Sequence, residues 1–280
     1  MSTAEATQAA IVDTATPAIE ARDVTVRFGG LVALNEVSLS VPPASIVGLV
    51  GPNGAGKTTL FGVFSGLLHP QGGEVYLAGR KITGAAPSKR ARLGLARTFQ
   101  QLELFMGLTV REHIILGYRV RNQRNRLWTD LFTAGALHPS TDDERARVDR
   151  LVDLLGLRAV ANTAASVLPL GTARRVEVAR ALATGPSIVL LDEPSSGLDG
   201  HETAQLGAAL RTVVDEEKVS LLLVEHDVAM VLGLSSEVAV LDFGVRIAYG
   251  TPDEIRNDPA VRAAYLGDDE AVEGNPEGEA

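Results

Sequence analysis

The sequence predicts an α/β protein with a mostly parallel central sheet, a β-rich segment before it and a helical block inserted into it. Three observations predict this class. Strand-like alternation and short apolar runs fill the region before residue 100, helical patterns dominate from about 101 to 184, and strand and helix patterns alternate after residue 186. Alternating strands and helices indicate units whose strands run parallel.

Composition is consistent with a globular protein. The chain has 280 residues, of which 45% are hydrophobic and 22% charged, so it can bury a core as one large domain or two small ones. Zero cysteines exclude disulfides and thiolate metal sites and fit a reducing compartment. The N-terminus lacks the basic cluster and apolar core of a signal peptide, and we expect a soluble chain because no uncharged apolar run is long and unbroken enough to span a membrane.

Charge is unevenly distributed. The net charge is −9, but the last 13 residues hold six acids and no base, which leaves −3 for residues 1–267. A nearly balanced body argues against nucleic-acid binding, which needs a basic face. We predict disordered tails at 1–18 and, as an acidic tail, at 268–280, with one domain from 19 to 267.

The N-terminal part has the pattern of an antiparallel β subdomain. Alternate apolar residues occur in "VTVRF" (24–28) and in "VSLSV" (37–41), and "EVYLAGRKI" (74–82) indicates a strand pair. The apolar run "SIVGLV" (45–50), bounded by glycine, is typical of a buried parallel strand.

The inserted block shows helix signals. Thr109 and Glu112 form the pattern of a capping box at the start of "TVREHIILGY". In "VDRLVDLLGL" one helix face collects the apolar side chains, and Gly156 is the expected stop. That face consists of Val148, Leu151, Val152 and Leu155. In "RNRLWTDLFTAG" (124–135), Leu127, Trp128, Leu131 and Phe132 come close together if helical, and packing inside the helical subdomain is favoured over contact with a partner.

The C-terminal part returns to alternating elements. Strand patterns occur in "SIVLLD", "VSLLLVEH", "EVAVLD" and "VRIAYG", and helix patterns in "ETAQLGAALRTVVDE" and "VAMVLGL". The "DFG" at 242–244 mimics a kinase metal-binding motif, but no H-R-D loop precedes it. A hairpin turn is therefore the better interpretation.

The strongest chemical signal is "GPNGAGKTT" (51–59), which fits the phosphate-loop pattern and directly follows a predicted strand. Its glycines let backbone N–H groups surround a polyphosphate at the start of a helix. Lys57 would reach the β- and γ-phosphates, and the Thr58 hydroxyl would bind Mg²⁺. The predicted nucleotide-binding residues here are Gly51, Pro52, Asn53, Gly54, Ala55, Gly56, Lys57, Thr58 and Thr59.

Two carboxylates end the apolar strand "SIVLLDEP" (187–194). Asp192, at a strand end beside the phosphate loop, is the expected second protein ligand of Mg²⁺. Glu193, the next residue, is then positioned to polarise the attacking water. A strand ending in Asp-Glu is often only a solvated turn, so this assignment depends on the phosphate loop.

Together these motifs resemble the ATP-binding subunit of an ABC transporter, from about residue 19 to 267. The resemblance implies a phosphate-loop NTPase fold with a RecA-like sheet, ATP and Mg²⁺ as cofactors, and ATP hydrolysis. It implies that Phe28 stacks on adenine, although a strand phenylalanine is as often a core residue. It also implies that Gln100, in "ARTFQQ", contacts Mg²⁺ and the catalytic water, that Asp199 of "SSGLD" faces the opposite nucleotide site, and that His226 contacts the γ-phosphate.

The stretch "LPLGT" (168–172) occupies the position of the family's L-S-G-G-Q signature, because "ARRVEVARAL" (173–182) is similar to the helix that follows it. Pro169 supplies neither a hydroxyl nor an N–H, and Leu170 adds bulk. What remains are the N–H groups of Gly171 and Thr172, the helix dipole and a Thr172 hydroxyl that we expect to cap the helix. The resemblance implies that this loop closes on the partner's γ-phosphate, so we predict slower turnover at the site opposite it.

Within the family, "ARTFQ", "LFMGLTVREHI" and "GTPDEIRNDPAVRAAYLG" resemble the ATPases of branched-chain amino-acid importers. That group implies two membrane permeases, a second ATP-binding subunit in a heterodimer or homodimer, an external binding protein and a peripheral place at the cytoplasmic membrane face. Lipopolysaccharide-exporter ATPases share a similar ending. Two further alternatives are a non-transport ABC ATPase, which generally has two nucleotide domains or long coiled coils, and a small-molecule kinase, which leaves His226 unexplained.

Overall fold

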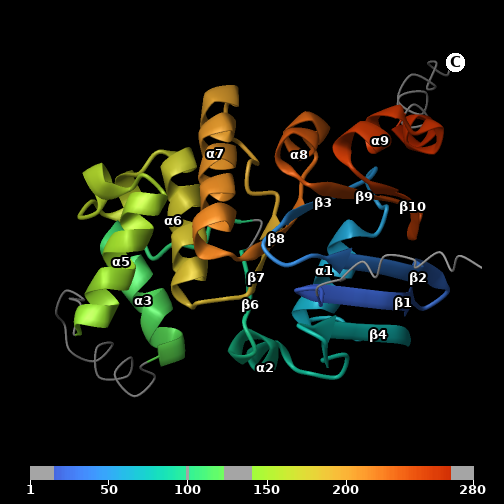
Figure 1. The fold of residues 1–280 in the computed structure, drawn as a ribbon, viewed down its shortest axis with the longest axis horizontal. Helices are drawn as coiled ribbons and strands as arrows, with labels where there is room; N and C mark the ends of the chain where they lie inside the picture. Colours follow the sequence, from blue (N-terminus) through green and yellow to red (C-terminus); the bar gives the residue numbers. More distant parts are fainter. Residues whose placement is uncertain (1–15, 99–100, 123–140, 266–280) are drawn as a thin grey trace, which may run out of the picture.

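The computed structural model describes residues 16–98, 101–122 and 141–265. It contains two sheets with helices packed between and beside them (Figure 1). The strands are β1 (Ile19–Phe28), β2 (Leu31–Val41), β3 (Ile46–Val50), β4 (Gly72–Leu77), β5 (Arg80–Lys81), β6 (Leu95–Arg97), β7 (Ile188–Asp192), β8 (Ser220–Val224), β9 (Glu237–Asp242) and β10 (Val245–Gly250). The predicted α/β class is confirmed.

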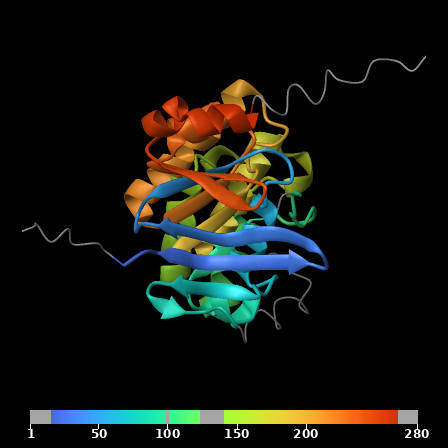
Figure 2. The same ribbon diagram turned by 90° about the vertical axis from the view of Figure 1, so that its right-hand side faces the viewer.

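The N-terminal sheet is antiparallel, with the strand order β2-β1-β4-β5. Figure 2 shows β1 and β2 side by side, with β4 next to β1. The alternation in the sequence sets its buried face: Val24, Val37 and Leu39 are at most 1% exposed. The pattern breaks at Phe28, which ends β1 with about half of its surface exposed. The interpretation of Phe28 as a core residue is therefore wrong.

The second sheet has the strand order β10-β9-β3-β8-β7-β6, and every pair except β10 with β9 is parallel. Every residue of β3, β7 and β8 is buried, because helices cover both faces of these strands. Alternate residues of β7 enter two different cores: Ile188 and Leu190 face one, Val189 and Leu191 the other. The continuous apolar runs in the sequence follow from this double burial.

The helices occupy both sides of the parallel sheet. The first helix, α1, lies between the two sheets, where Leu60, Phe61 and Phe64 are fully buried against strands of both. The other face of the parallel sheet packs against α6, α7 and α8 (Figure 1). The helices outside the inserted block are α1 (Lys57–Ser65), α2 (Pro87–Arg92), α7 (Gly200–Glu217), α8 (Val228–Leu234) and α9 (Pro252–Asn257).

The inserted block is helical as predicted, with α3 (Val110–Asn122), α5 (Asp142–Leu154), α6 (Leu170–Ala183) and the short 3-10 turns Arg158–Val160 and Ala165–Val167. The capping box is confirmed, since the Thr109 N–H donates to Glu112 at 2.7 Å and the Glu112 N–H donates to the Thr109 hydroxyl at 3.3 Å. The four apolar residues predicted on one face of α5 and its end are all buried, and Gly156 has the left-handed φ of 64° expected after a helix. The tails 1–15 and 266–280 and the segment 124–135 lie outside the described residues.

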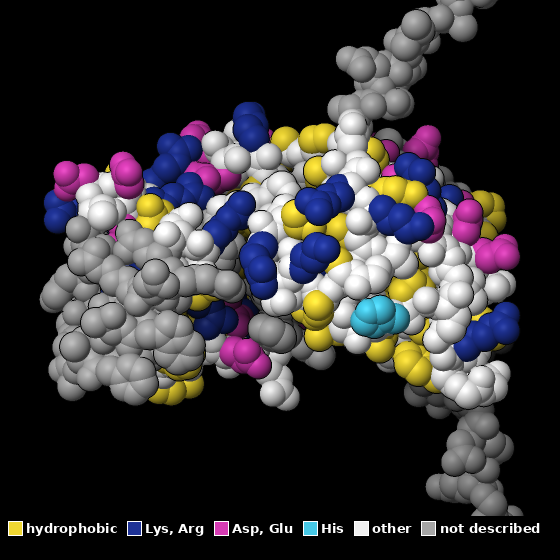
Figure 3. Space-filling view, turned by 90° about the horizontal axis from the view of Figure 1, so that it is seen from below, with side chains coloured by type: hydrophobic (Ala, Val, Ile, Leu, Met, Phe, Trp, Pro, Cys, Tyr) yellow, Lys and Arg dark blue, Asp and Glu magenta, His cyan; other side chains and the backbone are white. Residues whose placement is uncertain are grey.

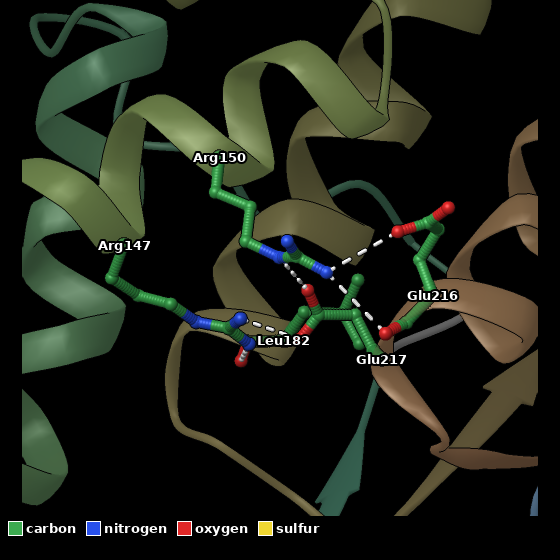
Figure 4. A network of polar contacts seen from close by, with 5 residues as sticks. All are labelled: Arg147, Arg150, Leu182, Glu216 and Glu217. Carbon is green, nitrogen blue, oxygen red and sulfur yellow. Dashed lines mark hydrogen bonds and ion pairs between the residues drawn. The ribbon is translucent and has the colours of Figure 1, made fainter.

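Three helices from separate parts of the chain are joined by a polar network (Figure 4). Arg147 and Arg150 extend from α5 to Glu217 at the end of α7, with Arg150 Nε 2.7 Å from its carboxylate. Arg147 also donates to the Leu182 carbonyl of α6 at 3.0 Å. Burial by itself raises the pKa of Glu217, but hydrogen bonds from Arg150 and Arg147 outweigh it and leave that pKa below its usual range. The network fixes the helical block against the sheet domain.

We expect Glu217→Gln to reduce the free energy of unfolding by about 1–2 kcal/mol at pH 7, because two arginines lose their charged acceptor. A carboxyl group with a lowered folded pKa stabilises fully above its unfolded pKa of about 4.3, and this contribution is lost as the pH falls through the folded value. Urea unfolding of wild type and variant at pH 7 and pH 3.5 should therefore show a difference that shrinks in acid.

Glu216→Gln is the matched control for this pair, since the Glu216 carboxylate lies 3.4 Å from Arg150 and is more than half exposed. It should change stability by less than about 0.5 kcal/mol at either pH. An equal effect of the two substitutions would contradict the assignment of the stabilisation to Glu217.

Candidate nucleotide-binding and hydrolysis site

A cavity of about 520 Å³ opens where the two sheets meet at the start of α1. Its lining comes from four separate parts of the chain: the β1–β2 turn, the phosphate loop, the ends of β7 and β8, and the β9–β10 turn. The lining residues are Phe28, Leu31, Val32, Ala33, Asn53, Gly54, Ala55, Gly56, Lys57, Thr58, Thr59, Glu193, His226, Phe243 and Gly244. The structure thus brings together most of the residues that the sequence singled out.

The phosphate loop connects β3 to α1 through a tightly constrained backbone. Gly56 precedes the helix with a left-handed φ of 102°, a conformation in which other residues are strained. A Cβ on Gly51 would lie 2.1 Å from the Leu241 carbonyl oxygen, so no side chain fits there. The Lys57 ammonium folds back over the loop and donates to the carbonyls of Gly51 at 2.6 Å and Pro52 at 2.9 Å. The loop is preformed, with its lysine already placed over it.

Glu193 and His226 meet at the edge of the cavity. Glu193 directly follows β7 and His226 lies two residues after the neighbouring parallel strand β8, and Nε2 of His226 lies 2.6 Å from Oε1 of Glu193. About half of the imidazole is exposed, whereas the Glu193 side chain is mostly buried. A carboxylate paired with a histidine in the same cavity as a phosphate loop has the geometry of a group that can accept a proton from water.

Asp192 is buried and is not part of the cavity lining. Its Oδ2 lies 2.9 Å from a guanidinium nitrogen of Arg97, which ends β6, and its N–H is 3.4 Å from the Thr98 hydroxyl. Burial raises the pKa of Asp192, and the charge of Arg97 opposes this effect. Arg97 is a residue that sequence reasoning missed, because only the pairing of β6 with β7 places it beside Asp192.

The donor types suit Mg²⁺, but only one of the two lines the cavity. Thr58 offers a hydroxyl oxygen there, whereas the carboxylate of Asp192, one residue before the cavity-lining Glu193, pairs with Arg97 outside the lining. Hard oxygen donors of this kind, completed by phosphate oxygens, suit Mg²⁺, which is usually held by few protein ligands. No group of three or more acidic or histidine side chains that could hold a metal by itself occurs in the part of the chain that the structure describes. Gln100, the third predicted metal ligand, lies outside the described residues.

An apolar wall covers one side of the cavity. Phe28, Leu31 and Val32 are all exposed hydrophobic residues at the β1–β2 turn. Across from them, Phe243 and Gly244 form the turn of the β9–β10 hairpin, which confirms the interpretation of "DFG" as a hairpin turn. Phe243 has a left-handed φ of 40° and is 88% exposed. Sequence reasoning missed its place at the cavity, which depends on the hydrogen bond from the Gly244 N–H to the Ala55 carbonyl at 3.0 Å.

The residues of the altered signature lie away from this cavity, at the start of α6. Pro169 is the N-cap and makes no side-chain cap, and the Thr172 hydroxyl accepts from Arg175 at 3.3 Å. The expectation that Thr172 caps the helix is wrong, because the helix already begins at Leu170 and Thr172 is its third residue. Gly171 is packed closely on Glu202 of α7: a Cβ there would lie 3.0 Å from its carboxylate.

Asp199 also lies outside the cavity lining, at the N-terminus of α7. Its carboxylate accepts from the Glu202 N–H at 2.8 Å, and Glu202 accepts from the Asp199 N–H at 3.4 Å, which completes a capping box. Sequence reasoning did not identify this cap, although the spacing of Asp199 and Glu202 carries the signal. Neither Asp199 nor the signature loop (168–172) therefore lines the cavity that contains the phosphate loop.

Fold and site define the class of this protein: a phosphate-loop ATPase with a RecA-like parallel sheet, an antiparallel β subdomain and an inserted helical block. Residues 34–196 match the family model described as ABC transporter. The chain belongs to this family, and it binds nucleotide and hydrolyses ATP as an ABC-type ATPase.

Individual relatives of the chain are described as ATP-binding proteins of branched-chain amino acid transport. The chain is 38% identical over 252 residues to the high-affinity branched-chain amino acid transport ATP-binding protein LivG of Salmonella typhimurium, an alignment that covers 90% of this chain and 98% of LivG. BraF of Pseudomonas aeruginosa, which carries the same description, is also 38% identical, with the same coverage. Residues 245–271 match a second model, described as branched-chain amino acid ATP-binding cassette transporter.

A solved structure of an ABC transporter ATP-binding cassette has the same fold as this chain. The crystal structure of the ADP conformation of MJ1267, an ATP-binding cassette of an ABC transporter, superposes with a TM-score of 0.77 at 26% identity. The superposition covers 90% of this chain and 99% of that one. The predicted fold and family are confirmed.

Proposed function

We propose that this chain is the ATP-hydrolysing subunit of an importer of branched-chain amino acids or similar small solutes. The observation that carries the proposal is the match of residues 245–271 to the branched-chain model, beyond the part of the chain that the general ABC transporter model covers. The alignment with LivG over 98% of its length supports it. In this role the protein uses MgATP to drive closure of a dimer, and hydrolysis reopens it.

Different residues of the cavity bind different parts of the nucleotide. Phe28 stacks on the adenine ring at the apolar wall, and the N–H groups of the phosphate loop surround the phosphates at the start of α1. Lys57 leaves the carbonyls of Gly51 and Pro52 and contacts the β- and γ-phosphates. Thr58, Gln100 and, once released from Arg97, Asp192 would hold Mg²⁺, which would neutralise developing phosphate charge.

Hydrolysis then depends on the pair at the ends of β7 and β8. Glu193 accepts the proton of the attacking water through a carboxylate oxygen at the cavity edge. His226, 2.6 Å from that carboxylate, orients it and contacts the γ-phosphate. Both residues lie within two positions of the ends of buried strands, so the pair needs little rearrangement before reaction.

The second nucleotide site of the dimer uses the surface at the start of α6. Gly171 and Thr172 lie in the first turn of α6, where backbone N–H groups have no partner inside the helix, and Asp199 lies nearby on α7. These residues would face a nucleotide held by a second ATP-binding subunit, the same or a different chain. Because Pro169 supplies no N–H and Leu170 is bulky, we propose that the site closed by this loop turns over more slowly than the site built on Lys57 and Glu193.

The proposed partners are two transmembrane permeases, which this chain would contact from the cytoplasmic side, with an external binding protein acting through them. Within the described parts of the chain, every helix is too short or too polar to cross a membrane. Figure 3 shows lysine and arginine side chains gathered on the face that carries α2. Arg80, Lys81 and Lys89 line a hollow of about 220 Å³ there, and Arg92 is exposed on the same helix. A basic face of this kind supports a peripheral place against an anionic leaflet.

Uptake by cells tests the proposed function. Deleting the gene from its source cell should reduce the uptake of radiolabelled leucine, isoleucine or valine, and a plasmid copy should restore it. A Lys57→Ala copy should not restore uptake, since it lacks the cation that contacts the phosphates. A Lys89→Ala copy, changed at an exposed residue of α2, tests the basic face separately. Unchanged uptake with accumulation of lipopolysaccharide would favour the exporter alternative.

A further inference from the structure

The backbone at Glu193 is in an unusual conformation. Glu193 directly follows β7 and has a φ of +47°, in the left-handed region that non-glycine residues seldom adopt. Such a conformation persists only where the surrounding structure holds it. The Glu193 N–H donates to the Val224 carbonyl at 2.9 Å, and the Ser196 N–H donates to the Glu193 carbonyl at 3.1 Å. These two bonds begin a tight turn, and the turn directs the Glu193 carboxylate toward His226.

A buried carboxylate completes this turn. Glu225 lies between β8 and His226, and it is only 3% exposed. Its Oε1 accepts from the Ser195 N–H at 2.7 Å. Because Glu225 itself lies in the loop after β8, this bond joins the two loops that carry the Glu193–His226 pair.

Glu225 has no direct access to a substrate. It is not part of the cavity lining, which contains its two neighbours in this network, Glu193 and His226. Burial raises the pKa of Glu225, and hydrogen bonds from Ser195 and His226 oppose that change. A buried carboxyl group is costly unless such donors satisfy it, so its presence beside a strained turn indicates a specific role.

We propose that Glu225 is a positioning residue for hydrolysis: it locks the turn from Glu193 to Ser196 in the left-handed conformation that places the Glu193 carboxylate against His226. The role rests on the proposed assignment of Glu193 and His226 to hydrolysis. It acts on the rate of the chemical step and leaves nucleotide binding to the phosphate loop on the other side of the cavity.

Steady-state kinetics of the purified full-length chain separate these two effects. Glu225→Ala should lower kcat for MgATP at least about 10-fold and leave KM within about 3-fold, because only the placement of the catalytic pair changes. Glu225→Gln should retain at least about a third of the wild-type kcat, because its amide oxygen still accepts from the Ser195 N–H. A kcat of Glu225→Ala within 2-fold of wild type, or a rise in KM as large as the loss in kcat, would overturn the proposal.

Glu144→Ala is the control for a general loss of stability. It removes another fully buried carboxylate, which is paired with Arg119 between α3 and α5 and lies in the helical block. It should lower the unfolding midpoint while kcat at temperatures below that midpoint stays unchanged. An equal loss of kcat in this control would mean that lost stability explains the effect of Glu225→Ala, and would overturn the proposal.

Hydrogen exchange supplies a readout that does not depend on activity. Amides of the segment 193–199 should exchange faster in Glu225→Asp than in wild type, because the shorter aspartate cannot reach Ser195, and at close to the wild-type rate in Glu225→Gln. Unchanged exchange in Glu225→Asp would overturn the locking role even if Glu225→Ala does not fold. A wild-type chain that fails to bind MgATP would instead contradict the proposed function, and the exchange result would still test the turn.

Discussion

Glu193→Gln is expected to reduce ATP turnover by about 100-fold or more while MgATP binding is retained. The glutamine amide is similar in size to the carboxylate that lies 2.6 Å from His226, but it cannot accept a proton from water. ATP should then accumulate in the closed dimer, because closure needs only binding and reopening needs hydrolysis. Release of phosphate and the elution volume with MgATP in gel filtration measure the two effects.

Glu237→Gln serves as the control, since its carboxylate accepts from the Tyr249 hydroxyl at 2.7 Å and lies outside the cavity lining. It should hydrolyse ATP at the wild-type rate and remain in the same oligomeric state as wild type. Continued steady turnover in Glu193→Gln would contradict the assignment of Glu193 as the general base.

Arg90→Met is expected to reduce the free energy of unfolding by about 3 kcal/mol or more. Arg90 of α2 is fully buried, and within the described residues its hydrogen bonds go to the carbonyls of Val63, Phe64, Thr83 and Ala85. Two of these carbonyls end α1, the helix that begins at the phosphate loop, and without Arg90 all four would be buried without this donor. Burial lowers the pKa of Arg90 to about 10, so the arginine itself is costly and offsets part of the gain.

Lys89→Met, one residue earlier on the same helix, is the comparison, since Lys89 is exposed. It should change stability by less than about 0.5 kcal/mol. Urea unfolding of the two variants at pH 7 distinguishes them. If Arg90→Met were as stable as Lys89→Met, the hydrogen bonds from Arg90 to the last turn of α1 would not be needed for stability.

Most of the fold could be predicted because its signals are local. Apolar periodicity in β1, the continuous run in β3 and the Thr109–Glu112 box each depend on residues a few positions apart. The phosphate loop belongs to the same group, since its glycines and Lys57 form the site within one short segment. Whether Phe28 is buried could not be decided in this way. The apolar alternation in the sequence of β1 continues through Phe28, but the buried core ends before this residue.

The sequence by itself determined the class of protein, the phosphate loop and the choice of Glu193 and His226, which follow β7 and β8, as candidate catalytic residues. Tertiary structure alone decided which polar groups meet: Arg97 with Asp192, Glu193 with His226, and Glu225 with the Ser195 N–H. These partners are separated by 95, 33 and 30 positions in the chain, and parallel strands bring them to one edge of a sheet. The order of strands in that sheet depends on how all helices cover both of its faces, so no short segment contains the information that pairs them.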